Sequence, residues 1–275
     1  MHLPYIDPVA LSLGPLSVHW YGICAFTGVL MAWITAMRVA RKWPSWNDEL
    51  VETFLLYIFV GALLGARLGY ILFYNAAYYW QNPLDIFFLW EGGLSFHGAL
   101  CGGLITIWLC CRHYQKNLLQ AMDLAALSAP LVIFCMRIAN FINAELWGRP
   151  TDGPWGVIFA TDPEKLLRHP SQLYEAVLEG LVLFFVLNWL ALRDRKNQPD
   201  GLLAALFLVG YGIFRISIEF VRTPDTHIGF DLWGWVTRGQ LLTLPVLIAG
   251  VGLFVYIMRS SLLLHWDRAI KRFYR

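Results

Sequence analysis

Charged residues are scarce in this sequence. Asp, Glu, Lys and Arg make up 15% of its 275 residues, whereas a soluble domain contains about 25%. Hydrophobic residues make up 58%, and the mean hydropathy is +0.53. This composition excludes a soluble enzyme and predicts an integral membrane protein. The net charge of +2 gives no indication of a nucleic-acid partner.

Several catalytic and metal-binding motifs are also missing. The five cysteines form no CxxC pair, which argues against a zinc site and a disulfide framework. We expect them to pack as small buried hydrophobic residues. No GxSxG or HExxH motif supports an intramembrane hydrolase. No metal and no cofactor is predicted.

Segments that would divide or process the chain are absent as well. Residues 1–15 lack the positive start and the apolar core of a cleavable signal peptide, so the first span should direct insertion itself. No internal repeat or long linker is visible. We expect residues 1–275 to form one integral membrane domain.

Seven apolar segments are close to the roughly 20 residues that a helix needs to cross a bilayer. The predicted fold is therefore an all-α polytopic membrane protein with about seven transmembrane helices, whose termini lie on opposite sides. The segments are residues 16–37, 51–74, 94–111, 118–142, 171–192, 201–220 and 240–258.

Basic residues divide the connecting loops into two sets. One set, which includes the C-terminal tail, has 13 Lys and Arg in 44 residues, and the other, which includes the N-terminus, has five in 81. Because basic loops stay in the cytoplasm, we expect the N-terminus outside and the C-terminus inside. The longest outward loop, 143–170, is rich in Gly and Pro and should form a small head. Within it, residues 155–160 could form a short strand.

Ionisable residues inside the apolar segments indicate a functional site, because a charge at that depth is costly unless it has a partner or a ligand. Arg137 and Asn140 are three residues apart in the fourth span. A stripe in the sixth span recurs every three or four residues, so one helix face carries all its members. Two arginines facing one cavity would form a clamp for phosphate or carboxylate. The stripe consists of Tyr211, Arg215, Glu219 and Arg222.

A structural role is the alternative for each arginine. Arg215 could pair with Glu219 one turn away, and Arg137 with Glu145 or Asp123. For Arg67 a functional and a structural role are equally expected, since the small residues around it also permit close helix packing.

Two further side chains are candidates for proton transfer or ligand contact. His97 lies among glycines, which allow a ligand or a helix to approach closely, and histidine is the usual proton acceptor near neutral pH. Tyr21 lies beside a glycine near the outward end of the first span. A lone histidine of this kind can also simply bond to a neighbour.

A phospholipid is the simplest ligand for this set, with its acyl chains among the spans and its phosphate on Arg137 and Arg215. A transporter or channel for a small organic anion is the competing function, since arginines in a cavity serve both. Transporters often have two similar halves, and this sequence shows no such duplication.

The segment from Arg137 to Arg149 resembles the signature of bacterial prolipoprotein diacylglyceryl transferases. Five other blocks match that family's pattern in the same order, so the resemblance covers nearly the whole chain. The family pattern has glycine where this sequence has Ala99, Ala139 and Ala144, and alanine is acceptable there if the backbone is helical. The other blocks are 65–70, 93–98, 169–175, 214–225 and 238–240.

The resemblance implies transfer of a diacylglyceryl group from phosphatidylglycerol to the lipobox cysteine of a prolipoprotein signal peptide, in the bacterial inner membrane. A thioether forms and glycerol phosphate is released. The nucleophile then belongs to the substrate, and something must take its proton. We expect His97 to be that base, with Tyr21 or Glu145 as lesser contributors.

The remaining predicted roles concern the lipid. Arg137 and Arg215 would bind the phosphate, and Glu219 would hold Arg215 in place. Tyr211 and Arg222 join the same lipid-binding set. The residues expected to orient the head group are Asn140, Asn143, Glu145 and Gly148.

Overall fold

The computed structural model describes residues 2–14, 16–88, 93–193, 198–223, 230–232 and 236–273. Six helices in this part of the chain are long and apolar enough to cross a membrane, and Gly98–His113 is a shorter apolar helix. The prediction of a polytopic helical membrane protein is confirmed. The first span begins at Trp20 rather than at residue 16, because residues 16–19 form a strand.

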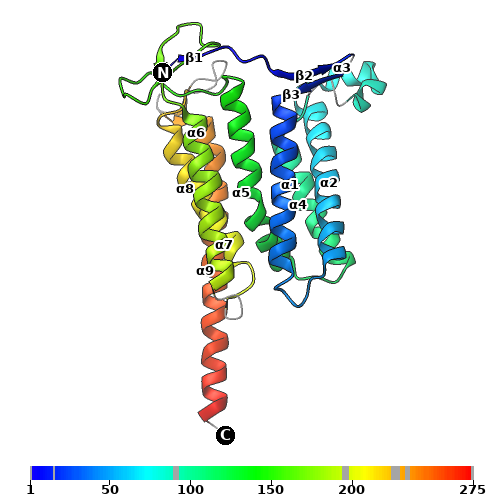
Figure 1. Ribbon diagram of the computed structural model, residues 1–275. Coiled ribbons are helices and arrows are strands. Elements are labelled where there is room, and N and C mark those ends of the chain that lie inside the picture. Colours follow the sequence, from blue (N-terminus) through cyan, green and yellow to red (C-terminus); the bar gives the residue numbers. More distant parts are fainter. Residues whose placement is uncertain are drawn as a thin grey trace. The chain divides into compact units, whose positions relative to one another are not determined.

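The helices follow one another along the chain, and short strands lie between some of them (Figure 1). They are α1 (Trp20–Ala40), α2 (Asp48–Tyr74), α3 (Ala76–Gln81), the 3-10 helix η1 (Pro83–Phe87), α4 (Phe96–His113), α5 (Leu118–Ile142), α6 (Ser171–Glu175), the π-helical η3 (Ala176–Val182), α7 (Leu183–Arg193), α8 (Leu202–Glu219) and α9 (Arg238–Phe273). The described residues divide into two compact units, one of residues 37–122 and one of residues 1–36 with 123–275.

Helices α2 and α4 of the first unit pack backbone against backbone. A Cβ atom added to Gly98 would lie 2.2 Å from the carbonyl oxygen of Gly65, and one added to Gly102 would lie 2.2 Å from that of Gly61. Only glycine permits this approach. The expectation that small residues allow close helix packing is confirmed, and the glycines after His97 serve this contact.

Arg67 has a structural role in the same unit. The residue is 4% exposed, and its guanidinium donates hydrogen bonds to the carbonyl oxygens of Ile86 at 2.9 Å and Asp85 at 2.5 Å. It also donates to the carbonyl of Gly93 at 3.2 Å and lies over the ring of Tyr79. Arg67 thereby holds the segment after α2 against that helix.

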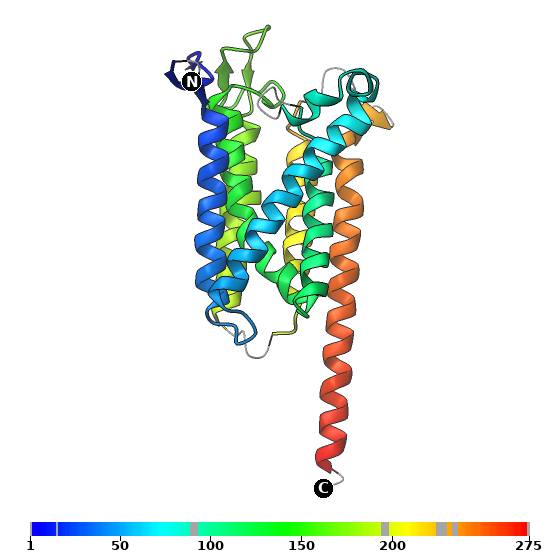
Figure 2. The ribbon, with the colours of Figure 1, turned by 90° about the vertical axis from the view of Figure 1, so that its right-hand side faces the viewer.

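Helices α8 and α9 of the second unit lie side by side, and α9 extends past the end of α8 (Figure 2). Segments α6, η3 and α7 run on without a break from Ser171 to Arg193. Asp123 in α5 fixes the start of α8, since its carboxylate accepts hydrogen bonds from the amides of Gly201 and Ala204, both at 2.9 Å. These contacts set the relative heights of α5 and α8.

A small head follows α5, as the sequence predicts. Its sheet has the order β1 (His2–Leu3), β4 (Val157–Phe159) and β5 (Leu167–Arg168), with β1 parallel and β5 antiparallel to β4. Strand β4 lies within the apolar stretch 155–160. Leu3, Ala144, Val157 and Phe159 form its buried core. Two hairpins complete the described strands, β2 (Val9–Leu13) with β3 (Leu16–His19), and β6 (Phe230–Leu232) with β7 (Val236–Thr237).

A buried ion pair fixes the loop between β4 and β5. The Arg168 guanidinium bonds to Asp162 at 2.6 and 3.0 Å and to Glu164 at 2.5 Å. Hydrogen bonding by Arg168 is the main reason that the pKa of Asp162 is lowered, and the same bond raises the pKa of Arg168. The amides of Glu164 and Leu166 also donate to Asp162.

Candidate functional site

Three arginines meet at one buried carboxylate, that of Glu175 at the end of α6. Arg137 from α5 brings its Nε within 2.9 Å of Oε2. Arg215 from α8 and Arg222, just beyond α8, both donate from Nη1 to Oε1, the latter at 3.0 Å. Glu175 has no exposed surface. The two arginines predicted to converge therefore do so, and Arg222 joins them.

A second acid, Glu219 at the end of α8, contacts Arg215 and Arg222. Its Oε1 lies 2.5 Å from Nη2 of Arg215 and 3.9 Å from Nε of Arg222. Thr237 donates to its Oε2 at 2.7 Å, and a Cβ atom on Gly239 would lie only 2.4 Å from its Oε1. The pairing of Arg215 with Glu219 is confirmed, and it coexists with the contact to Glu175.

The end of α5 carries a chain of polar contacts. Nη1 of Arg137 donates to Oδ1 of Asn140 at 3.4 Å, and Nδ2 of Asn140 donates to Oε1 of Glu145 at 2.8 Å. Gln172 holds the backbone of Glu145 through a 2.6 Å bond to its carbonyl. The alternative in which Arg137 pairs with Glu145 or Asp123 is wrong, because the partners of Arg137 are Glu175 and Asn140, Asn140 bonds to Glu145, and Asp123 caps α8.

The turn after α5 has an unusual backbone. Ala144 has φ +53° and Leu146 has φ +60°, a region that costs a non-glycine residue roughly 1–2 kcal/mol. The condition that alanine replaces glycine only in helical backbone therefore fails at Ala144, although Ala99 and Ala139 meet it within α4 and α5. Strain of this kind gathers at functional sites.

Gly148 follows this turn and is needed for packing. Its amide donates to the carbonyl of His169 at 2.8 Å. A Cβ atom there would lie 2.6 Å from both the Cβ of His169 and the carbonyl oxygen of Val221. The expected role of Gly148 in orienting a head group stays a prediction, and its amide hydrogen is already bonded.

Three other predicted residues lie on α1, on α8 and just after α5. Tyr21 is 44% exposed and lies within electrostatic range of Glu145 and Arg137. Tyr211 lies within the same range of Arg215. Asn143 has a buried Oδ1 with no hydrogen-bond partner in the part of the chain that is described. A buried acceptor of this kind can take a hydrogen bond from a water or from a ligand hydroxyl.

His97 is the second residue of α4, but its side chain lies outside the described part of the structure. Its expected role as the base therefore stays a prediction.

Two acids in the site were not singled out from the sequence. Glu175 ends the block 169–175, and Glu179 follows it by four residues with no exposed surface. Their spacing puts them on one side of a helix that begins with polar residues. The sequence did contain a signal for them, because an acid within a predicted span is a natural partner for the two arginines predicted within other spans.

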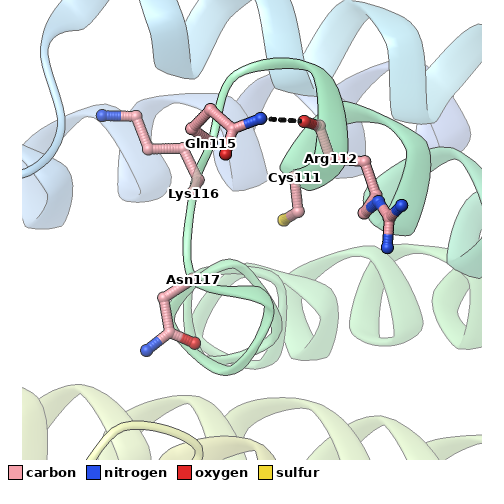
Figure 3. A pocket seen from close by; sticks show the side chains of 5 residues that line it. All are labelled: Cys111, Arg112, Gln115, Lys116 and Asn117. Carbon is pink, nitrogen blue, oxygen red and sulfur yellow. Dashed lines mark hydrogen bonds between the residues drawn. The ribbon is translucent and has the colours of Figure 1, made fainter.

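A hollow of about 500 Å³ lies at the turn between α4 and α5 (Figure 3). Two of its polar side chains are already bonded, since Nζ of Lys116 donates to the carbonyl of Ser45 at 2.6 Å and Gln115 donates to that of Arg112 at 3.0 Å. None of the predicted site residues lines it. The hollow is lined by Cys111, Arg112, Gln115, Lys116 and Asn117.

Comparison with known sequences agrees with this geometry. A model of the prolipoprotein diacylglyceryl transferase family matches residues 8–256. The chain belongs to this family. The matched region contains Glu175, Glu219 and all three arginines that meet at Glu175, so the cluster is part of the transferase domain.

Curated relatives are similar over almost their whole length. The chain is 45% identical over 259 residues to the phosphatidylglycerol–prolipoprotein diacylglyceryl transferase of Ectopseudomonas mendocina (strain ymp), covering 94% of this chain and 96% of that protein. It is 46% identical over 251 residues to the enzyme of the same name from Pseudomonas savastanoi pv. phaseolicola, covering 90% and 92%. The enzyme from Pseudomonas aeruginosa (strain LESB58) is 44% identical over 259 residues, covering 94% and 96%. The chain is thus a multi-pass membrane transferase of this family.

Proposed function

We propose that the arginine cluster binds the phosphate of phosphatidylglycerol while the diacylglyceryl group is transferred to the lipobox cysteine of a prolipoprotein. Family membership supports the reaction. The convergence of Arg137, Arg215 and Arg222 on Glu175 is the observation that carries the assignment of the site, because clustered guanidiniums are suited to bind phosphate.

Arg137 is the arginine best placed to contact the lipid. Its side chain is 19% exposed, against 11% for Arg215 and Arg222. Its contacts with the described residues use Nε and Nη1, and none of them uses Nη2. Arg215 uses both Nη atoms on Glu175 and Glu219 and so fixes the cluster.

The proposed step uses a substrate thiol as nucleophile. A base, His97 with Tyr21 or Glu145 as lesser contributors, takes the thiol proton, since the thiolate is the reactive form. The thiolate attacks the glycerol carbon that carries the phosphate, a C–S bond forms, and the C–O bond breaks with its electrons going to the phosphate oxygen. Glycerol phosphate leaves with one more negative charge, which Arg137 and Arg215 stabilise.

The amides near the turn after α5 would orient the glycerol head group. The unpartnered Oδ1 of Asn143 suits a hydroxyl donor, which the head group of phosphatidylglycerol provides. Asn140 is held between Arg137 and Glu145 and would keep the guanidinium directed at the phosphate.

The proposal places this activity in the bacterial inner membrane. The N-terminus and the head, 143–170, face outward and the C-terminus faces the cytoplasm, as the distribution of basic residues favours. Residues 1–275 act together as one integral membrane domain.

The test combines the purified chain, phosphatidylglycerol labelled in its acyl chains, and a lipobox peptide. Label appearing on the peptide cysteine supports transfer. Label in free lipid products would mean that the protein hydrolyses the lipid. If no reaction occurred, transport of an anion would be the remaining candidate function. Full transfer activity of His97→Gln would show that His97 is not the base. Unchanged lipid binding by Arg137→Ala would show that Arg137 does not bind the phosphate.

A further inference from the structure

Glu179 is a buried acid that the proposed reaction does not use. It lies in the π-helical segment η3, has no exposed surface, and neither of its carboxylate oxygens accepts a hydrogen bond from any described residue. Single π-helical turns in helices occur often at functional sites. An ionised carboxylate buried without donors is far costlier than a neutral one.

The surroundings of Glu179 make the missing hydrogen bonds informative. Charges from α5, α6 and α8 all act on it, yet the arginines direct their hydrogen bonds and ion contacts to Glu175 and Glu219 instead. An ionised Glu179 beside such donors would be expected to accept at least one of their hydrogens. The charged and titratable groups that act on it electrostatically are Glu175, Arg137, Arg215, Arg222 and Tyr211.

The charge of the cluster depends on this one proton. The three guanidiniums and the two carboxylates that they contact directly, those of Glu175 and Glu219, sum to one net positive charge. An ionised Glu179 would reduce the net charge to zero. A phosphodiester carries one negative charge, and a zwitterionic head group adds a cation that the guanidiniums would repel.

We propose that Glu179 carries a proton in the resting protein and so keeps one net positive charge on the arginine cluster, which selects a phospholipid with a singly negative head group. Glu179 is then a specificity-determining residue. This inference rests on the proposed phosphate site.

Infrared spectroscopy tests the proton directly. In an ester-free detergent, the parent protein should show a carbonyl stretch of a protonated carboxylic acid that shifts with ¹³C-labelled glutamate, and Glu179→Gln should lack it. Glu52→Gln, the same change at an exposed acid of α2, should retain the band. A spectrum of Glu179→Gln that keeps the band would overturn the proposal.

Lipid binding tests the consequence. As pH rises, deprotonation of Glu179 adds a negative charge, so binding of phosphatidylglycerol by the parent should weaken on the order of tenfold. Glu179→Gln stays neutral at every pH. It should bind phosphatidylglycerol as tightly as the parent does at low pH, and its binding should not weaken as pH rises. Identical pH profiles for the two proteins would contradict the proposal, as would loss of binding by a Glu179→Gln protein that melts at the parental temperature.

The two proposals fail in different ways. If the purified chain transfers no diacylglyceryl group, the phosphate site is in doubt, while the infrared result still reports the proton on Glu179. If transfer proceeds and the band persists in Glu179→Gln, only the inference about Glu179 is wrong.

Discussion

A guanidinium group has five N–H donors in a fixed plane, and Arg137 directs part of this fork at Glu175 and Asn140. The remaining donors give the residue its proposed function, and the bound ones hold the plane in position. The buried carboxylates thus do not occupy all the hydrogen-bond donors of the arginines. They fix the direction in which the free hydrogens point.

Replacing Arg137 by Lys tests this geometry. Lysine keeps the charge but loses the fork, so we expect kcat/KM for transfer to fall on the order of 100-fold. The same substitution at Arg41, which pairs with Asp48 at the surface, should leave transfer unchanged. Equal activity of Arg137→Lys and the parent would mean that only charge matters at this position.

Ala144 offers a second test at this scale. Because its φ is +53°, Ala144→Gly relieves backbone strain and should raise the free energy of unfolding by up to about 1 kcal/mol. Ala139→Gly, within α5 and fully buried, should lower it by about 1 kcal/mol. Thermal unfolding in detergent measures both, and a loss of stability in Ala144→Gly would contradict the strain argument.

Among the elements, α2 and α4 approach so closely at Gly65 and Gly98 that their backbone atoms are in contact. A Cβ atom on Gly98 would lie 2.2 Å from the oxygen of Gly65, so Gly98→Ala must push the helices apart. We expect a loss of about 1–3 kcal/mol in unfolding free energy. Gly103→Ala, whose Cβ would have only contacts at 3.9 Å, is the matched control and should not destabilise. Equal melting temperatures for the two variants would show that the helices are not tightly packed.

The head should respond to acid through Asp162. Its pKa is lowered mainly by the hydrogen bond from Arg168, so the folded state binds this proton less readily than the unfolded chain. The stabilisation is complete above the unfolded pKa of about 3.9 and is lost as pH falls through the folded pKa. Asp162→Asn should be less stable than the parent at neutral pH, and the difference should shrink in acid. A constant difference would rule out this linkage.

Helices and turns differ in how far the sequence predicts them. The apolar runs marked the six helices that are long and apolar enough to cross a membrane and the shorter apolar helix α4, because length and hydrophobicity can be read directly from the sequence. Strand β3 was missed, and the first span was begun four residues early. Residues 16–19 directly precede the apolar run of the first span, and their sequence does not distinguish a strand from a first helical turn. Their pairing with β2 makes them a strand.

For the whole molecule, the orientation in the membrane remains to be tested. A green fluorescent protein fused after residue 275 should fluoresce, because the basic tail keeps the C-terminus in the cytoplasm. Alkaline phosphatase at the same position should be inactive. The reverse result would invert the proposed topology and put the head on the cytoplasmic side.

The sequence by itself determined the membrane class, the family and the position of the charged residues, because burying a charge in lipid is costly enough to mark each one as purposeful. It did not determine which acid each arginine would meet. Arg137, Arg215 and Glu175 are far apart along the chain, and several acids were available to each arginine. The three residues meet because of how far α5, α6 and α8 are shifted along their axes relative to one another. That shift depends on tertiary contacts such as the cap that Asp123 makes on α8.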